Sequence, residues 1–190
     1  MTDRISAIVA DSLDVKRRFF DAHAGDVQRA AGLIAAALKV NGKFLVFGNG
    51  GSAADAQHIA GELVNRFLQK RRGLPAIALT TDGGVLTCIA NDTGFENIFA
   101  RQVEALGTKG DVCLAISTSG ASVNIINACK QSCDQGIKVI GLLGRDGGRV
   151  ASLCDLALIV PSQDTQRIQE THNLIGHIIC ELIEAELFKN

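Results

Sequence analysis

An apolar run that breaks into glycines, and then into an alanine-rich stretch, constrains this chain more than any other feature. The run covers residues 44–47, the glycine-rich turn residues 48–51, and helical periodicity continues to about residue 67. Such a run is typical of a buried strand that leads directly into a helix. Glycines let a ligand approach the backbone, and the first N–H groups of a helix attract anions. This stretch therefore predicts an anion-binding loop, with Ser52 as the expected helix N-cap.

The helix after this loop carries His58 and Glu62 on one face, because they are four residues apart. An imidazole and a carboxylate placed in this way can share a metal ion or act together in proton transfer. A solvated helix pair is the common alternative. The glycines from residue 48 also fit the short GxGxxA pattern of dinucleotide-binding proteins, but that site needs an acidic residue about 20 positions later. Asp82 lies much farther along and in a glycine turn, which argues against this class.

Four more apolar runs of strand length alternate with helical stretches farther along the chain. They are residues 76–79, 112–116, 138–143 and 156–160, and a long final helix is expected from about residue 165 to 189. Short apolar strands that alternate with helices are typical of a parallel sheet covered on both faces. We therefore predict a three-layer α/β fold with a doubly wound, five-stranded parallel sheet.

The N-terminal part is expected to add a helical pair to this sheet. Residues 3–40 show two apolar helical faces that separate near Ala24-Gly25. A pair of this kind must bury its apolar faces against the rest of the chain or another subunit. We expect one domain over residues 1–190, in which 1–41 serve packing and oligomerisation and 42–190 carry the sheet and its flanking helices.

The third predicted strand leads into a second loop suited to anions. Ser117, Thr118, Ser119 and Ser122 bring four hydroxyl groups to a strand-to-helix turn, whereas a plain capped turn needs one. No lysine follows the loop, which argues against a nucleotide-triphosphate P-loop. Both loops follow parallel strands, so they are expected at the same carboxyl edge of the sheet. The pattern favours a single phosphoryl group held by neutral donors.

Composition excludes several other classes of function. A net charge of -1 gives no electrostatic reason to expect a nucleic acid or an anionic membrane as a partner. The absence of Trp and Tyr removes the usual platforms for stacking bases. The first residues are charged and no apolar stretch reaches transmembrane length, so a cytoplasmic protein is expected.

The cysteines predict neither a disulfide framework nor a cysteine zinc site. No CxxC pair is present, and the residues fall within apolar strands and helices. We expect reduced, packed thiols at Cys88, Cys113, Cys129, Cys133, Cys154 and Cys180.

Four stretches, in this order and at these separations, resemble the sugar isomerase (SIS) domain family and, within it, the phosphoheptose isomerases that act on sedoheptulose 7-phosphate. They are GNGGSAADAQHIAGE, NDTGFENIFARQVEALGTKGDV, ISTSGAS and RIQETHNLIGH. The resemblance implies an aldose–ketose isomerase that forms D-glycero-D-manno-heptose 7-phosphate through an enediol, without an organic cofactor. The product would feed nucleotide-activated heptose for lipopolysaccharide or another surface glycan.

The resemblance also implies roles for individual residues. Glu62 and His177 match the proton-transfer pair of the family. The family binds one divalent ion per subunit, usually Zn²⁺, and its ligands match His58, Glu62, Gln169 and His177. The positions that match substrate contacts are Asn49, Gly50, Gly51, Ser52, Glu62, Asn91, Asp92, Ser117, Thr118, Ser119, Ser122 and Gln169. Members of the family form homotetramers with active sites at subunit interfaces. This would let different subunits supply Gln169 and His177, which helix rise separates by about 12 Å.

Two alternatives stay open within the same family. One is a non-catalytic adaptor of the replication-initiation type, which lacks the residues that match Glu62 and His177; both are present here. The other is an isomerase for a different sugar phosphate, since its phosphate site and enediol chemistry would be the same. The chain also departs from some isomerases at Gln166, where an acid can occur, although Asp164 is close by.

Overall fold

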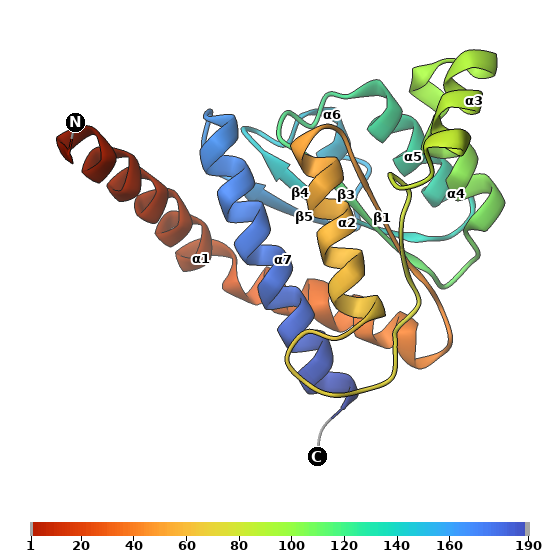
Figure 1. Ribbon diagram of the computed structural model, residues 1–190, viewed down its shortest axis with the longest axis horizontal. Helices are drawn as coiled ribbons and strands as arrows, with labels where there is room; N and C mark the ends of the chain where they lie inside the picture. Colours follow the sequence, from red (N-terminus) through yellow and green to blue (C-terminus); the bar gives the residue numbers. More distant parts are fainter. Residues whose placement is uncertain (1, 189–190) are drawn as a thin grey trace.

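The computed structural model describes residues 2–188, which form a five-stranded, all-parallel sheet with helices on both faces (Figure 1). The elements in chain order are α1 (Thr2–Lys39), β1 (Phe44–Gly48), α2 (Gly51–Val64), β2 (Ala76–Ala78), α3 (Gly83–Thr93), the 3₁₀ turn η1 (Phe95–Asn97), α4 (Ala100–Leu106), β3 (Val112–Ser117), α5 (Val123–Asp134), β4 (Lys138–Gly144), α6 (Gly148–Ala151), β5 (Leu156–Val160) and α7 (Thr165–Leu187). The strand order is β2-β1-β3-β4-β5. The predicted α/β class and doubly wound parallel sheet are confirmed.

The central strands are buried along their whole length because helices cover both of their faces. Every residue of β1 and β3 is buried, and the two strands pair in register from Phe44 opposite Val112 to Gly48 opposite Ile116. A strand with only one covered face would instead alternate apolar and polar residues. The carboxyl ends of β1 and β3 therefore lie side by side, and so do the loops that follow them.

Two apolar cores fill the spaces on either side of the sheet. Alternate residues of β1 point to opposite cores: Phe44 and Val46 pack with α1, α2 and α7, whereas Leu45 and Phe47 pack with α4 and α5. Figure 1 shows α2 and α7 side by side over the first face. This pair of helices carries His58, Glu62, Gln169 and His177.

The predicted N-terminal helical pair is wrong, because α1 runs without a break from Thr2 to Lys39. A glycine inside a helix costs only about 1 kcal/mol relative to alanine. Phe19 and Val27 are buried on either side of Gly25, and their packing against the body offsets that cost. The sequence pattern showed a change of apolar face at Ala24-Gly25, which did not require a turn.

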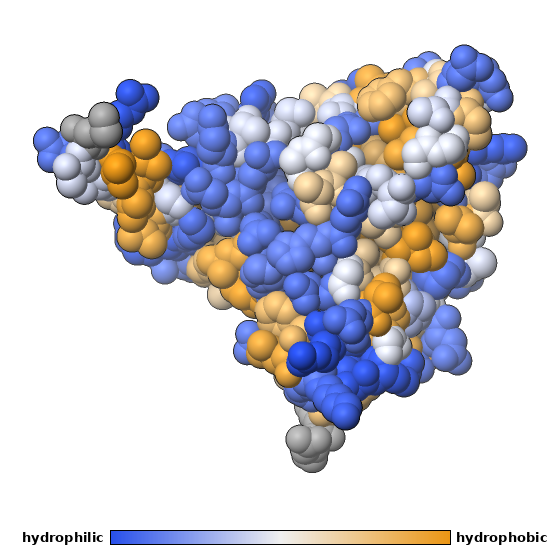
Figure 2. Space-filling view, viewed as in Figure 1, coloured by the Kyte–Doolittle hydropathy of each residue, from blue (hydrophilic) through white to orange (hydrophobic). Residues whose placement is uncertain are grey.

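The first part of α1 projects beyond the body of the protein (Figure 1) and leaves apolar residues exposed. Figure 2 shows apolar surface on this arm. The exposed side chains are Ile5, Ile8, Val9 and Leu13.

The prediction of packed cysteine thiols needs one correction. All six cysteines fall in the described residues and are free thiols, but Cys88 and Cys133 are exposed and not packed.

Within residues 2–188, no helix combines the length and the apolar character needed to cross a membrane.

Candidate active site

Helices α2 and α7 approach each other closely because glycines face side chains at two points. A Cβ atom on Gly176 would lie 2.8 Å from Ile59 Cδ1, and one on Gly51 would collide with the side-chain amide of Gln169. Larger residues at these positions would separate the helices or displace their neighbours. The small residues thus bring the functional faces of α2 and α7 together.

A small polar cavity of about 70 Å³ lies at the carboxyl ends of β1 and β3. Both predicted anion loops contribute to it, together with one residue from the start of α7. Its lining consists of Asn49, Ser52, Ile116, Ser117, Thr118, Ser119, Ser122 and Gln169. The lining is rich in hydroxyl and amide groups and holds no charged side chain, as a site for a phosphoryl group held by neutral donors requires.

The glycine loop, which consists of residues 48–51, forms a tight turn into α2. Gly50 has a φ of 57°, which a residue with a side chain rarely adopts, and Ser52 N donates to Asn49 O at 3.0 Å. The prediction that Ser52 caps the helix is wrong: Gly50 is the N-cap, and within residues 2–188 no side chain caps this end. The N–H groups of Ser52 and Ala53 donate to the carbonyl oxygens of Asn49 and Gly50, at 3.0 Å each, and the buried Ser52 lines the cavity.

The serine loop, which consists of residues 117–122, is stabilised by its own hydroxyl groups. Gly120 N donates to Ser117 Oγ at 3.0 Å, and Ala121 N donates to Ser119 Oγ at 3.3 Å. Gly120 has a φ of 60°, and a Cβ atom there would collide with Gly147 O. Because each serine oxygen accepts one of these bonds, its own O–H proton is left to donate to a ligand.

Asn124 joins the two loops, a role that the sequence analysis missed. Its side-chain amide exchanges two hydrogen bonds with the side chain of Asn49, at 2.9 and 2.8 Å, and its Oδ1 also accepts from Ile125 N. Asn124 is buried on α5. The sequence did contain a signal for Asn124, since it precedes two apolar residues on the inward face of a predicted helix. A buried amide needs hydrogen-bond partners, so this position indicated a polar contact inside the protein.

Farther along α2, the three side chains predicted for proton transfer and metal binding do meet. His58 Nε2 lies 3.1 Å from Glu62 Oε1 and 3.3 Å from His177 Nε2. One ligand atom from each residue falls within 4.8 Å of the others. Glu62 and His177 are half-buried, and His58 is more open. The cluster is therefore accessible to a small ligand.

Aromatic and amide groups form the walls of this cluster. The ring of His177 lies 4.9 Å from that of His58 and 5.5 Å from that of Phe67. Asn173 Nδ2 lies 3.4 Å from His58 Nδ1. Burial raises the pKa of Asp55, against the opposing effects of the His58 charge and the Asn173 amide. The His58 ring therefore contacts the His177 ring and the Asn173 amide, both from α7.

Two imidazole nitrogens and one carboxylate oxygen suit a divalent ion of the zinc type. Catalytic zinc sites use three protein ligands of these kinds and keep a further position for water or substrate. The donor set of His58, Glu62 and His177 fits this description.

Gln169 lies at the other end of the site from this cluster. Its amide packs against Gly51 and lines the anion cavity. It stands eight residues before His177 on α7, which corresponds to about 12 Å of helix rise. Its predicted contact with substrate fits this place, and its part in metal binding stays a prediction.

Asn91 and Asp92 are not brought to the site by this chain. They are exposed at the end of α3, where Asn91 Nδ2 donates to Asp92 Oδ1 at 2.9 Å. Figure 1 shows α3 at the far side of the molecule from α7. Their predicted contact with sugar hydroxyls stays a prediction.

His172 is a core histidine of α7 and takes no part in the cluster. It is fully buried on α7, and its Nε2 lies 3.0 Å from Leu143 O, to which it donates. Burial lowers its pKa to about 4, although the bond to Leu143 opposes this effect. His172 is therefore neutral in the folded protein at neutral pH.

Comparison with known proteins identifies the family to which this site belongs. The profile of the SIS domain matches residues 9–144. The chain belongs to the SIS domain family. The matched region contains both anion loops as well as His58 and Glu62, whereas His177 lies beyond it on α7.

Relatives within the SIS family match almost the whole chain, including α7. The chain is 53% identical to the phosphoheptose isomerase of Aquifex aeolicus over 184 residues, which cover 97% of this chain and 96% of the relative. It is 50% identical to the phosphoheptose isomerase of Thermodesulfovibrio yellowstonii, with 98% and 93% covered.

Solved structures in the family agree with the fold described above. The structure of a phosphoheptose isomerase from Neisseria gonorrhoeae has a TM-score of 0.92 and 43% identity, covering 97% of this chain and 98% of that chain. A phosphoheptose isomerase from Francisella tularensis has a TM-score of 0.92 and 40% identity, covering 96% and 97%.

Proposed function

We propose that this protein is a phosphoheptose isomerase. It interconverts sedoheptulose 7-phosphate and D-glycero-D-manno-heptose 7-phosphate by proton transfer through an enediol. Relatives with this name share about half of its residues over nearly the whole chain, which supports the assignment. In the cell the product would enter the synthesis of nucleotide-activated heptose for lipopolysaccharide or another surface glycan.

The observation that carries the proposal is the position of the His58, Glu62 and His177 cluster relative to the anion cavity. Both lie along the α2–α7 pair, and Ser52, which lines the cavity, is separated from His58 by about 9 Å of helix rise. A sugar phosphate with its phosphate in the cavity would therefore extend its carbonyl end toward the cluster. A site for phosphate alone would not need acid–base groups at that distance.

Glu62 and His177 divide the chemistry between them. The reaction removes a weakly acidic C–H proton at one carbon and returns a proton to its neighbour. The Glu62 carboxylate takes and returns the carbon-bound proton, and His177 exchanges protons with the oxygens of the same two carbons. The cavity would hold the phosphate so that the reacting carbons lie beside these two groups. Proton transfer then takes place within one bound complex and does not depend on a random encounter.

A divalent ion, which we propose to be Zn²⁺, would be held by His58, Glu62 and His177 with Gln169 as a further ligand. When bound, it would polarise the sugar oxygens and so increase the acidity of the C–H proton. Metal analysis of the purified protein, together with the loss of that metal from His58→Ala, tests this ligand set.

Assembly into a homotetramer belongs to the same proposal. The exposed apolar residues of the projecting α1 arm would be buried by a neighbouring subunit. Asn91 and Asp92, which lie away from this chain's cluster, would reach substrate at a shared interface. Light scattering measures the assembly state directly.

A non-catalytic adaptor is the alternative from a different class. It is less well supported, because His58, Glu62 and His177 are all present and close together. A different sugar phosphate as substrate would leave the same chemistry in place.

Proton NMR of sedoheptulose 7-phosphate with the zinc-loaded protein in D₂O tests the proposal. We expect an aldoheptose phosphate with deuterium at C2. If the sugar phosphate binds but is not converted, the result would contradict the isomerase proposal and support the non-catalytic adaptor. Other ketose phosphates in parallel samples test the substrate class.

A further inference from the structure

We propose that the buried ion pair of Glu184 and Arg71 is a positioning device for Glu62 and His177, an inference that rests on the proposed isomerase function. The two residues belong to α7 and to the loop of residues 65–75 that follows α2. Neither residue touches the cluster through its side-chain charge. They act by fixing the loop, the end of α2 and the ring beside His177.

Glu184 gathers the loop around one buried carboxylate. Its two oxygens accept hydrogen bonds from three successive backbone N–H groups, at 2.8, 2.8 and 2.9 Å, and from Arg71 Nε at 2.7 Å. The backbone donors are those of Phe67, Leu68 and Gln69. Both charged side chains are only 1% exposed. Burial alone would raise the pKa of Glu184, but these donors outweigh it and lower that pKa below its ordinary value.

Arg71 closes the end of α2, the helix that carries Glu62. Its Nη2 donates to the carbonyl oxygen of Glu62 at 2.9 Å, and its Nη1 donates to the carbonyl oxygen of Leu63 at 2.8 Å. The last carbonyl groups of a helix lack partners within the helix and carry its negative dipole end. A guanidinium group satisfies both needs at once. Arg71 thereby holds the backbone of Glu62 itself.

The same loop brings Phe67 against His177. The backbone N–H of Phe67 is bound to Glu184, and its ring lies 5.5 Å from the His177 ring at an interplanar angle of 31°. The His58 ring also contacts His177, with the ring centroids 4.9 Å apart. The His177 ring thus contacts both His58 and the Phe67 ring, a wall that Glu184 keeps in place.

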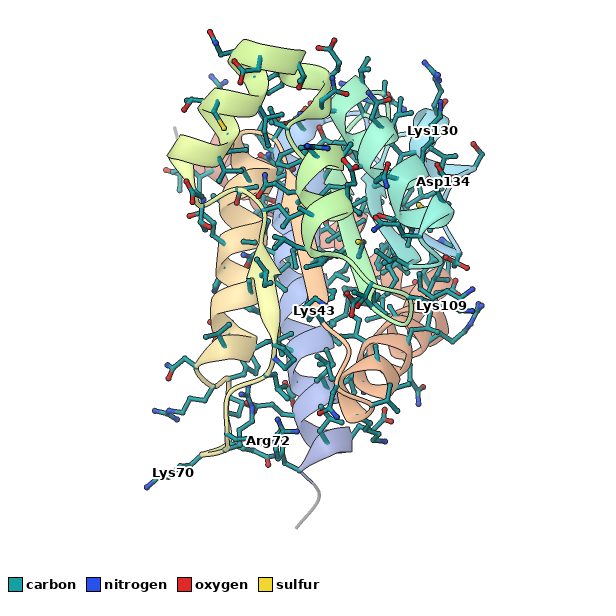
Figure 3. The ribbon with its side chains drawn as sticks, turned by 90° about the vertical axis from the view of Figure 1, so that its right-hand side faces the viewer. Lys43, Lys70, Arg72, Lys109, Lys130 and Asp134 are labelled. Carbon is teal, nitrogen blue, oxygen red and sulfur yellow. The ribbon has the colours of Figure 1, made fainter. Side chains whose placement is uncertain are left out.

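The neighbours of Arg71 in sequence provide matched controls. Lys70 and Arg72 are exposed, and Figure 3 shows the Lys70 side chain directed away from the body at the end of this loop. Their removal changes the charge of the same loop but none of the buried contacts. α7 itself stays anchored by core residues such as Ile175, Ile179 and Ile183.

Glu184→Gln is the direct test, because it keeps the shape and one acceptor oxygen but removes the charge. We expect kcat to fall about 10- to 100-fold, the range typical for partners that orient active groups, while KM stays within about threefold because the anion cavity is untouched. We also expect the ring protons of His177 to shift downfield in NMR spectra as Phe67 moves away. Lys70→Ala and Arg72→Ala should match the wild type in both measurements.

A second variant keeps the test decisive if Glu184→Gln does not fold. Phe67→Leu removes the wall of His177 and leaves the ion pair intact, so the His177 signals and kcat should change while stability is largely kept. Unchanged kcat and unchanged His177 signals in folded Glu184→Gln or Phe67→Leu would overturn the proposal. The NMR signals separate this result from failure of the proposed function, since they report the position of His177 even if the wild-type protein does not isomerise the heptose phosphate.

Discussion

Asn49 and Asn124 hold each other through two hydrogen bonds between their side-chain amides, of 2.9 and 2.8 Å, and so tie the glycine loop to the helix after the serine loop. The two residues are 75 positions apart in the chain. Asn49 and the serine loop both line the cavity, so this amide pair links the two sides of the cavity.

Asn124→Leu should weaken the binding of substrate. The substitution leaves the Asn49 amide and the Ile125 N–H group without their partner, and an unsatisfied buried polar group costs about 1–3 kcal/mol. We expect KM to rise about tenfold or more, with a smaller change in kcat, as measured by steady-state kinetics and by calorimetry with inorganic phosphate. Asn127→Ala on the same helix, whose side chain contacts Glu96 O instead, is the control. Equal phosphate affinity in wild type and Asn124→Leu would contradict this role.

Gly51→Ala should reduce activity without destabilising the fold. The added methyl group would collide with the amide of Gln169 and push this flexible side chain away from the cavity. Alanine in place of glycine inside a helix otherwise adds about 0.5–1 kcal/mol of stability. Thermal unfolding and kinetics measure the two effects separately.

Gly61→Ala on the same helix is the control for that variant. Its Cβ atom would meet nothing within 4 Å, so stability should increase and activity should stay as in the wild type. Full activity in Gly51→Ala would show that the position of Gln169 does not matter for turnover.

His172 should make the protein less stable in acid. Burial lowers its pKa to about 4, whereas a histidine in the unfolded chain titrates near 6.5. Between these values the unfolded chain binds a proton that the folded protein excludes, so the free energy of unfolding falls as pH falls from about 6.5 toward 4, by about 3 kcal/mol in all.

His172→Gln isolates this contribution, because it keeps a donor for Leu143 O and does not titrate. Urea unfolding at a series of pH values should show that the stability of the wild type declines more steeply in acid than that of the variant. Parallel pH dependences would mean that His172 is already protonated in the folded state or titrates normally.

The fold could be predicted from the sequence where the signal is local. The buried strands are short apolar runs, and the loops after β1 and β3 carry glycines and hydroxyls at fixed places, so the carboxyl edge of the sheet was found without coordinates. The turn predicted at Ala24-Gly25 was wrong because it rested on a local break in the apolar pattern. The buried side chains of Phe19 and Val27 stabilise a continuous α1 there, and this packing is not visible in the local sequence.

The candidate site could be predicted only in part. His58 and Glu62 are neighbours on one helix, so their spacing indicated their contact. Asn124 and Glu184 were missed because their partners come from loops far away in the chain, up to 117 positions in the case of Glu184 and Phe67. Only the tertiary structure shows that these polar residues are buried with complete sets of partners.

In the proposed mechanism the Glu62 carboxylate moves the carbon-bound proton. Glu62→Gln keeps the size of the side chain and removes the base, and positioned acid–base groups contribute about 10²–10⁴-fold in rate. The decisive measurement is the rate of deuterium incorporation at C2 of the heptose phosphate in D₂O, compared between the wild type and Glu62→Gln at saturating substrate. We predict that incorporation by the variant falls at least about 100-fold while its affinity for inorganic phosphate is unchanged. Deuterium incorporation at the wild-type rate in Glu62→Gln would contradict the account.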